Sequence, residues 1–134
     1  MVKQLPKQAE IVVIGGGIIG TSVAYHLTKL GRSDVVLLER KQLTSGTTWH
    51  AAGLVGQLRA TKNLTQLSQY TAKLYETLAQ ETGLETGFKQ RGSISLATTK
   101  ERMEELNRLA SMARCFGVEV EEISCDDVSR MWPL

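Results

Sequence analysis

The chain has 134 residues and a net charge of +2 at pH 7, and 42% of its residues are hydrophobic while only 5% are aromatic. A chain of this length corresponds to about one small folded domain. Its modest charge, without basic residues interleaved among aromatic ones, argues against nucleic acid as a partner. No apolar run reaches the roughly 18 residues that a membrane-spanning helix needs.

The N-terminal segment Met1–Gln8 is short and polar and has no apolar signal core. It predicts neither an export signal nor an attached transit peptide. We therefore expect a cytoplasmic protein if the source is bacterial, with the mitochondrial matrix as the alternative. The two cysteines, Cys115 and Cys125, lack the spacing of a zinc site and are interpreted as reduced thiols, so no metal ligands are predicted.

A glycine motif follows the first predicted strand. The β-branched apolar run Glu10–Ile14 is typical of a strand buried in a parallel sheet. Gly15, Gly17 and Gly20 then form the pattern G-x-G-x-x-G. In a dinucleotide-binding unit, these glycines permit the tight turn, the close approach of a pyrophosphate and the packing of helix on sheet, respectively. The helix predicted for residues 18–30 would present its N-terminal N–H groups and dipole to a phosphate.

A second strand, predicted for residues 34–38, leads to an acidic residue. Glu39 follows Gly20 by nineteen residues, the position at which a carboxylate accepts hydrogen bonds from adenosine ribose hydroxyls. It would also repel the 2′-phosphate of NADP, although the neighbouring Arg40 weakens that argument. A lone glycine pattern could be an unrelated turn, but strand, glycines, helix, strand and acid in this order predict an α/β, Rossmann-like dinucleotide-binding βαβ unit.

The segment after this unit favours FAD over a nicotinamide cofactor. A nicotinamide-type domain would continue with another helix and a third buried strand, whereas this chain enters the hydroxyl-rich, glycine-containing run Lys41–Thr48 and then the small residues Ala51-Ala52-Gly53. Small residues let a backbone lie flat against a large planar ligand. The run Ser45–Gly53, placed after such a unit, resembles the N-terminal part of the dimethylglycine and sarcosine dehydrogenase family of FAD enzymes.

The resemblance implies a set of cofactor contacts and a fold of the glutathione-reductase or D-amino-acid-oxidase type. The implied FAD-binding residues are Gly15, Gly17, Ile18, Ile19, Gly20, Glu39, Arg40, Gly46, Thr47, Thr48, Trp49, His50, Ala51, Ala52, Gly53 and Leu54. In the dimethylglycine dehydrogenase branch, the histidine that matches His50 carries FAD covalently through the flavin 8α-methyl group. The alternative is that His50 only hydrogen-bonds the cofactor or fills the loop. No catalytic acid or base is predicted.

The second half of the chain predicts further helices and strands. Apolar residues at three- and four-residue steps, including Leu64 and Leu67, predict a helix over 63–81. Alternation predicts a strand over 91–97, and a second helix is expected over 99–116. Residues 118–123 are expected to form a strand. The remaining segment, 126–131, is expected to add one more helical turn.

The resemblance covers nearly the whole chain and implies two regions. Residues 1–86 would be the N-terminal part of an FAD-binding domain, and residues 87–134 the start of a mixed α+β substrate domain. Members of this family are several times longer, so we expect an N-terminal fragment that is inactive alone.

For the full-length parent, the resemblance implies oxidative N-demethylation of an N-methylated amino acid by hydride transfer to flavin. Tetrahydrofolate would bind in the part outside this chain, and electrons would pass to an electron-transfer flavoprotein or to oxygen.

The sequence leaves two alternative functions open. One is a non-covalent FAD amino-acid oxidase or deaminase, which would keep the glycine motif and Glu39. The other is a non-catalytic relative like the pyruvate dehydrogenase phosphatase regulatory subunit, against which the presence of His50 counts.

Overall fold

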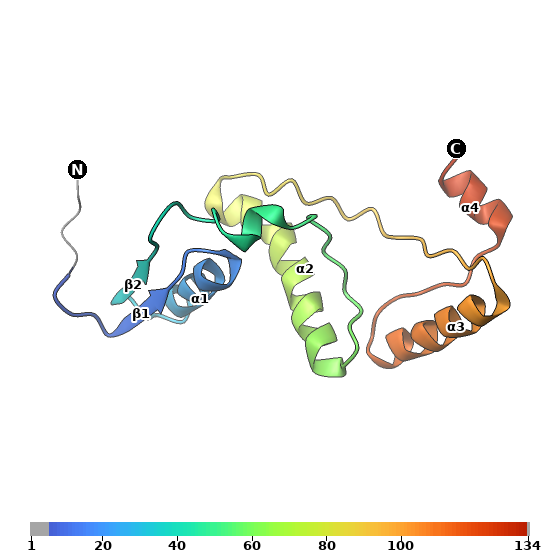
Figure 1. Ribbon diagram of the computed structural model, residues 1–134, viewed down its shortest axis with the longest axis horizontal. Coiled ribbons are helices and arrows are strands. Elements are labelled where there is room, and N and C mark those ends of the chain that lie inside the picture. The colour runs from blue at the N-terminus through green and yellow to red at the C-terminus, as the bar shows by residue number, and fades with distance from the viewer. Residues whose placement is uncertain (1–5, 134) are drawn as a thin grey trace. The chain divides into compact units, whose positions relative to one another are not determined.

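The structure is a computed structural model and describes residues 6–133, so most of the polar segment Met1–Gln8 lies outside the described residues. Two compact units divide the chain, residues 1–54 and residues 55–134. The elements in chain order are β1 (Ile11–Ile14), α1 (Ile18–Lys29), β2 (Val35–Leu38), the 3₁₀-helix η1 (Thr47–His50), α2 (Lys62–Thr82), α3 (Lys100–Cys115) and α4 (Cys125–Met131) (Figure 1).

The first unit contains a βαβ unit. β1 and β2 pair in parallel, with Ile11 opposite Val35 and Ile14 opposite Leu38, and α1 connects them (blue to cyan in Figure 1). The side chain of Val13 lies on the face that α1 covers, because a Cβ placed on Gly20 of that helix would lie 3.5 Å from its Cγ1 atom. Successive side chains alternate between the faces of a strand, so Val13 faces α1 while its neighbours face away from it.

A Schellman motif ends α1. Gly31 has a φ of +85°, its N–H donates to the Thr28 carbonyl at 2.9 Å, and the Arg32 N–H donates to the Leu27 carbonyl at 3.0 Å. These two bonds satisfy carbonyls at the end of the helix, and glycine takes the left-handed conformation without strain. The chain thus turns back at once into β2, which places the ends of both strands at the same edge of the sheet.

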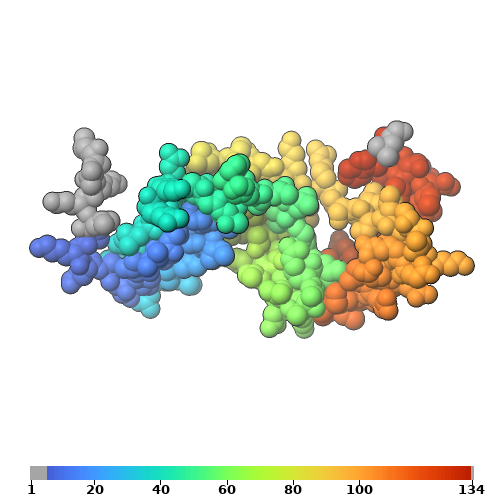
Figure 2. Space-filling view, viewed as in Figure 1, coloured from blue at the N-terminus to red at the C-terminus, as the bar shows by residue number. Residues whose placement is uncertain are grey.

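Three capped helices lie in the described part of the second unit, residues 55–133. Threonine side chains cap the first two: Thr61 accepts the Leu64 N–H in α2, and Thr99 accepts the Arg102 N–H in α3. α2 ends at Gly83, which has a φ of +70°. The connection from Gly83 to Thr99 contains no helix or strand and runs as a single extended segment (yellow in Figures 1 and 2).

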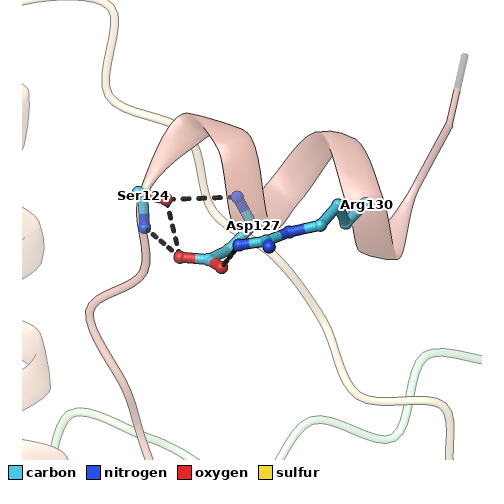
Figure 3. A network of polar contacts seen from close by, with 3 residues as sticks. All are labelled: Ser124, Asp127 and Arg130. Atoms are coloured by element: carbon cyan, nitrogen blue, oxygen red, sulfur yellow. Dashed lines mark hydrogen bonds and ion pairs between the residues drawn. The ribbon is translucent and has the colours of Figure 1, made fainter.

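α4 begins with a capping box (Figure 3). The Ser124 hydroxyl oxygen accepts the Asp127 N–H at 3.1 Å, and the Asp127 carboxylate in turn accepts the Ser124 N–H at 3.1 Å. The same carboxylate accepts the Ser124 hydroxyl at 2.6 Å and pairs with Arg130. These bonds hold the pKa of Asp127 below its ordinary value of 3.8, the Ser124 hydroxyl contributing most. The box satisfies N-terminal donors that the helix itself leaves unpaired.

A few contacts tie the second unit together. Thr65 is fully buried, and its hydroxyl accepts the Arg59 N–H at 3.0 Å. Gln69 in α2 donates through Nε2 to the Gly117 carbonyl at 2.8 Å, which joins α2 to the turn after α3. Among the described residues, the buried hydrophobic side chains are those of Ala72 and Ala113. The apolar core of the unit is therefore small.

The helices agree with the sequence prediction to within one or two residues at each end, but two predicted strands do not form. Residues 91–97 and 118–123 contain no strand. A strand requires a neighbour that pairs with its N–H and C=O groups, and the sheet in residues 6–133 consists of β1 and β2 alone. The strand predictions for these two segments are therefore wrong for this structure, because alternation of side chains does not by itself supply a pairing partner.

The buried residues of α2 differ from those that the sequence pattern predicts. Leu64 and Leu67, expected on the buried stripe of α2, are 51% and 61% exposed, while Thr65 and Ala72 are the buried residues of that helix.

The two compact units of the chain meet after residue 54, whereas the domain boundary is expected after residue 86. That domain boundary stays a prediction. Within residues 6–133, no helix is both long and apolar enough to span a membrane.

Candidate cofactor site

The predicted cofactor residues of the first unit meet at the carboxyl edge of the small sheet. The glycine turn follows β1, and Glu39 follows β2. The Gly15 N–H donates to the Leu38 carbonyl at 2.8 Å, so pairing continues one step beyond the strands and holds the two strand ends together. In open parallel sheets, ligands bind outside this edge.

Gly15 and Gly20 have the geometry that a tight turn and close helix packing require, whereas the pyrophosphate contact of Gly17 stays a prediction. Gly15 has a φ of +106°, and a Cβ placed on it would meet no atom within 4 Å, so open space lies beside the turn. A Cβ on Gly20 would lie 1.8 Å from the Gly15 carbonyl oxygen. Only glycine at position 20 lets the first turn of α1 approach the strand so closely.

Glu39 bonds to the glycine turn through its side chain. Its Oε2 atom accepts the Gly16 N–H at 2.8 Å, and its Oε1 atom accepts the Lys41 N–H at 2.8 Å. The Gly16 N–H contributes most, and the Lys41 N–H next, to holding the pKa of the Glu39 carboxyl below its ordinary value of 4.5. Glu39 is therefore ionised at neutral pH, and each oxygen retains a lone pair for a further donor.

The loop after Glu39 folds back over Gly16. The Thr44 N–H donates to the Gly16 carbonyl at 2.9 Å, with Thr44 at a φ of +65°. A β-branched residue adopts this left-handed conformation rarely, at a cost of order 1–3 kcal/mol. A Cβ on Gly16, which is buried, would lie 2.5 Å from Leu43 Cδ2. No sequence pattern assigned a role to Gly16, Leu43 or Thr44 individually, although three consecutive glycines could have indicated a crowded turn.

Thr48 reaches the N-terminus of α1. Its Oγ1 atom accepts the Ile18 N–H at 2.9 Å, and the cap residue of the helix, Gly17, has no side chain to do so. Within η1, the Ala51 N–H donates to the Thr48 carbonyl at 3.2 Å. The predicted loop thus lies directly against the predicted phosphate-binding turn.

The remaining predicted residues are exposed around this turn. The His50 ring stacks at a tilt on Trp49, with centroids 4.0 Å apart and 35° between the planes. Trp49 is 67% and Leu54 89% exposed, and Ile18 and Ile19 at the start of α1 are 54% and 78% exposed. The predicted residues that are also exposed are Arg40, Gly46, Thr47, His50, Ala51, Ala52 and Gly53.

These features fit a dinucleotide. The start of α1 and the open side of Gly15 would receive a pyrophosphate, since helix N-termini favour anions. Ionised Glu39 would accept hydrogen bonds from ribose hydroxyls. Exposed apolar side chains beside a polar turn are typical of sites that bind large planar ligands.

Comparison with known proteins decides the family. A family model described as FAD dependent oxidoreductase matches residues 10–134. The chain belongs to this family. The expectation of an FAD-binding α/β fold is thereby confirmed.

Curated relatives include much longer proteins with closely similar sequences. The chain is 44% identical to human mitochondrial sarcosine dehydrogenase over 133 residues, which is 98% of this chain and 14% of that protein. It is 46% identical to rat mitochondrial dimethylglycine dehydrogenase, covering 95% of this chain and 15% of that protein. It is also 45% identical to the mouse pyruvate dehydrogenase phosphatase regulatory subunit, covering 97% and 15%, respectively. The chain thus spans about one seventh of the length of these relatives and corresponds to a piece of such proteins.

A solved structure shares the fold. L-amino acid deaminase from Proteus vulgaris matches with a TM-score of 0.78 at 20% sequence identity, covering 94% of this chain and 30% of that chain. At this identity, the match concerns the fold alone.

Proposed function

We propose that the protein to which this chain belongs is an FAD-dependent enzyme that oxidatively removes a methyl group from an N-methylated amino acid. The observation that carries this proposal is similarity at 44–46% identity to sarcosine dehydrogenase and dimethylglycine dehydrogenase. The 4-methylaminobutanoate oxidase (formaldehyde-forming) of Paenarthrobacter nicotinovorans, 45% identical over 130 residues, supports it as well. The compounds in these three names are all amino acids with an N-methyl group.

The first unit would hold the cofactor. The glycines of the turn and the N-terminus of α1 would bind the pyrophosphate, and the Glu39 carboxylate would bind the adenosine ribose. The segment Gly46–Leu54 would lie along the rest of FAD. When bound, FAD supplies the hydride acceptor for the carbon next to nitrogen. The contribution of this chain is to bind and orient.

His50 is the residue that we propose to carry the flavin covalently. The proposed bond would join an imidazole nitrogen to the flavin 8α carbon in place of one N–H and one C–H bond; the two hydrogens would leave the flavin reduced until its electron acceptor reoxidises it. The exposed ring, in a segment that contacts the N-terminus of α1 through Thr48, supports this assignment. The alternative role for His50 is a hydrogen bond to a non-covalent FAD.

Partners and location follow from the same proposal. Electrons would leave through an electron-transfer flavoprotein or to oxygen, and tetrahydrofolate would capture the released one-carbon unit elsewhere in a protein of the relatives' length. Sarcosine and dimethylglycine dehydrogenase carry the word mitochondrial in their names, whereas the 4-methylaminobutanoate oxidase comes from Paenarthrobacter nicotinovorans. We accordingly propose a bacterial cytoplasm or a mitochondrial matrix.

The test uses the full-length protein purified from its native source. Intact mass under denaturing conditions should exceed that of the polypeptide by one FAD, because denaturation releases a bound flavin and retains a bonded one. The purified protein should also release formaldehyde from sarcosine, dimethylglycine or 4-methylaminobutanoate. His50→Ala should lose the added mass, whereas His26→Ala, the matched change on α1, should keep it.

Other outcomes favour the alternatives. Formaldehyde release without the added mass would leave the enzyme but reject the covalent bond. Flavin without formaldehyde from any of the three compounds would favour a different amino-acid oxidase or deaminase. Neither flavin nor formaldehyde would favour a non-catalytic role, as in the regulatory subunit that is 45% identical.

A further inference from the structure

The helix α1 begins without a cap of its own. Its cap residue is Gly17, which provides no side-chain hydrogen bond, and there is no acidic residue in the first turn. The first N–H groups of a helix have no partner within the helix. Here the Ile18 N–H finds one thirty residues away, because the Thr48 hydroxyl oxygen accepts it at 2.9 Å. A residue of η1 therefore performs a capping role that is normally local.

The glycine turn leaves room for this contact. A Cβ placed on Gly17 would lie 3.1 Å from Thr48 Oγ1, so close that the threonine side chain would have to shift by a few tenths of an ångström. The absence of a side chain at position 17 thus lets Thr48 of the same chain approach the N-terminus of α1. Thr48 is half-buried at the contact, whereas the neighbouring Thr47 is exposed.

Two further hydrogen bonds hold the loop between Glu39 and Thr48 against Gly16. Glu39 accepts the Gly16 N–H at 2.8 Å, and Thr44 donates to the Gly16 carbonyl at 2.9 Å. The Thr48 contact is the last of three that join the loop to the turn. Beyond it, η1 carries Trp49 and His50, whose backbone follows Thr48 directly. The position of both rings relative to the turn therefore depends on the Thr48 contact.

We propose that Thr48 is a positioning residue: its hydroxyl fastens η1 to the N-terminus of α1 and so fixes where Trp49 and His50 stand beside the glycine turn. The part of this inference that concerns flavin rests on the proposed function. The fastening itself does not, because it is a contact between two segments of the chain. Besides the direct FAD contact that the resemblance implies for Thr48, its hydroxyl would act on the flavin through the segment that it holds.

The test compares Thr48→Val, which keeps the shape but loses the acceptor, with Thr48→Ser, which keeps the acceptor, in the full-length protein. Hydrogen exchange by mass spectrometry is followed in the peptide that starts α1 and in the peptide that contains η1. Loss of one hydrogen bond should accelerate exchange in both peptides by about fivefold to tenfold in Thr48→Val. Thr48→Ser should exchange like the wild type. Ser45→Ala, which removes an exposed hydroxyl from the same loop, should leave exchange in the peptide that starts α1 unchanged.

A second variant approaches the contact from the other side. Gly17→Ala places a Cβ against Thr48 Oγ1 and should also accelerate exchange in the η1 peptide. If the wild type retains flavin after denaturation, the retained fraction should fall severalfold in Thr48→Val and recover in Thr48→Ser.

The results separate the two proposals. Exchange in Thr48→Val equal to that of the wild type, in either peptide, would overturn the positioning role. Accelerated exchange with an unchanged fraction of retained flavin would overturn the link to His50. A wild type without retained flavin would reject the covalent bond of the proposed function, while the two exchange rates would still decide the fastening.

Discussion

Gly20 is the position in the candidate site that tolerates least change. Its missing Cβ would lie 1.8 Å from the Gly15 carbonyl oxygen, and a backbone atom cannot rotate away as a flexible side chain can. We expect Gly20→Ala to push α1 off the strand, to destabilise the protein by more than about 2 kcal/mol and to abolish FAD binding. Thermal unfolding and flavin content of the purified variant measure both effects.

Gly56→Ala provides the control for this change. A Cβ there would lie 3.5 Å from an Arg59 side-chain nitrogen, an ordinary contact with the end of a flexible side chain. That variant should unfold like the wild type. A Gly20→Ala variant with normal flavin content and stability would show that α1 does not pack on the turn as described.

Glu39 should make FAD binding depend on pH. Because backbone N–H groups, Gly16 first, lower the pKa of its carboxyl in the folded protein, the ionised form stabilises the turn above the ordinary pKa of 4.5. This contribution is lost as the pH falls below 4.5 through the lowered pKa. Glu39→Gln should weaken FAD binding about tenfold or more at pH 7, since an amide cannot accept at both ends.

The measurement is FAD affinity between pH 4 and pH 7, by fluorescence titration of the full-length protein carrying His50→Ala, in which no covalent bond to that residue retains the flavin. Glu10→Gln is the matched control, since that carboxylate makes only an exposed ion pair with Arg32 at 3.1 Å. Affinity that is equal in Glu39→Gln and Glu10→Gln at neutral pH would contradict the role of Glu39.

The sequence identified Glu39, but it could not show what Glu39 contacts. The motif predicts a carboxylate for ribose at the end of β2, and the spacing from Gly20 sufficed for that. The bonds to the Gly16 and Lys41 N–H groups depend on the loop folding back over the turn, with Thr44 in a left-handed conformation. No local preference predicts a threonine there, because the conformation is imposed by surrounding contacts.

At the scale of elements, α4 depends on its capping box. The helix has only seven residues, too few to be stable from propensity alone. Ser124→Ala removes both the acceptor of the Asp127 N–H and a donor to the Asp127 carboxylate, so we expect α4 to lose about 1 kcal/mol. Hydrogen exchange in residues 125–131 of the full-length protein should accelerate about fivefold, whereas Ser129→Ala, within the same helix, should not change it. Equal exchange in both variants would mean that packing alone holds α4.

Helices were easier to predict than strands in this chain, for a physical reason. A helix satisfies its own backbone groups, and threonine or serine caps mark the starts of α2, α3 and α4 within the sequence. β1 and β2 were predictable because the glycine turn and α1 bring them together. Residues 91–97 and 118–123 have the alternation of strands, but the pairing that defines a strand is a property of the neighbours and is absent from these two segments.

At the scale of the whole molecule, the exposed area is large for the mass. The chain exposes 11500 Å², whereas a folded monomer of 14.8 kDa exposes about 7000 Å². Two separate bodies of half that mass would expose about 8400 Å² together. The exposed area of the chain therefore exceeds the expected area whether the chain is counted as one body or as two. Much of it is apolar, as at Ile14, which is 85% exposed on the sheet face away from α1.

The 134-residue chain, expressed alone, should therefore behave as a loosely packed protein. We expect it to bind the dye ANS strongly at pH 7, to melt over a broad range without a cooperative transition, and to be stabilised little by added FAD. The full-length protein should melt cooperatively and bind little dye, and the isolated chain in concentrated urea should bind none, which separates exposed clusters from a fully unfolded chain. A sharp transition with no dye binding in the isolated chain would show that residues 1–134 bury their apolar faces among themselves.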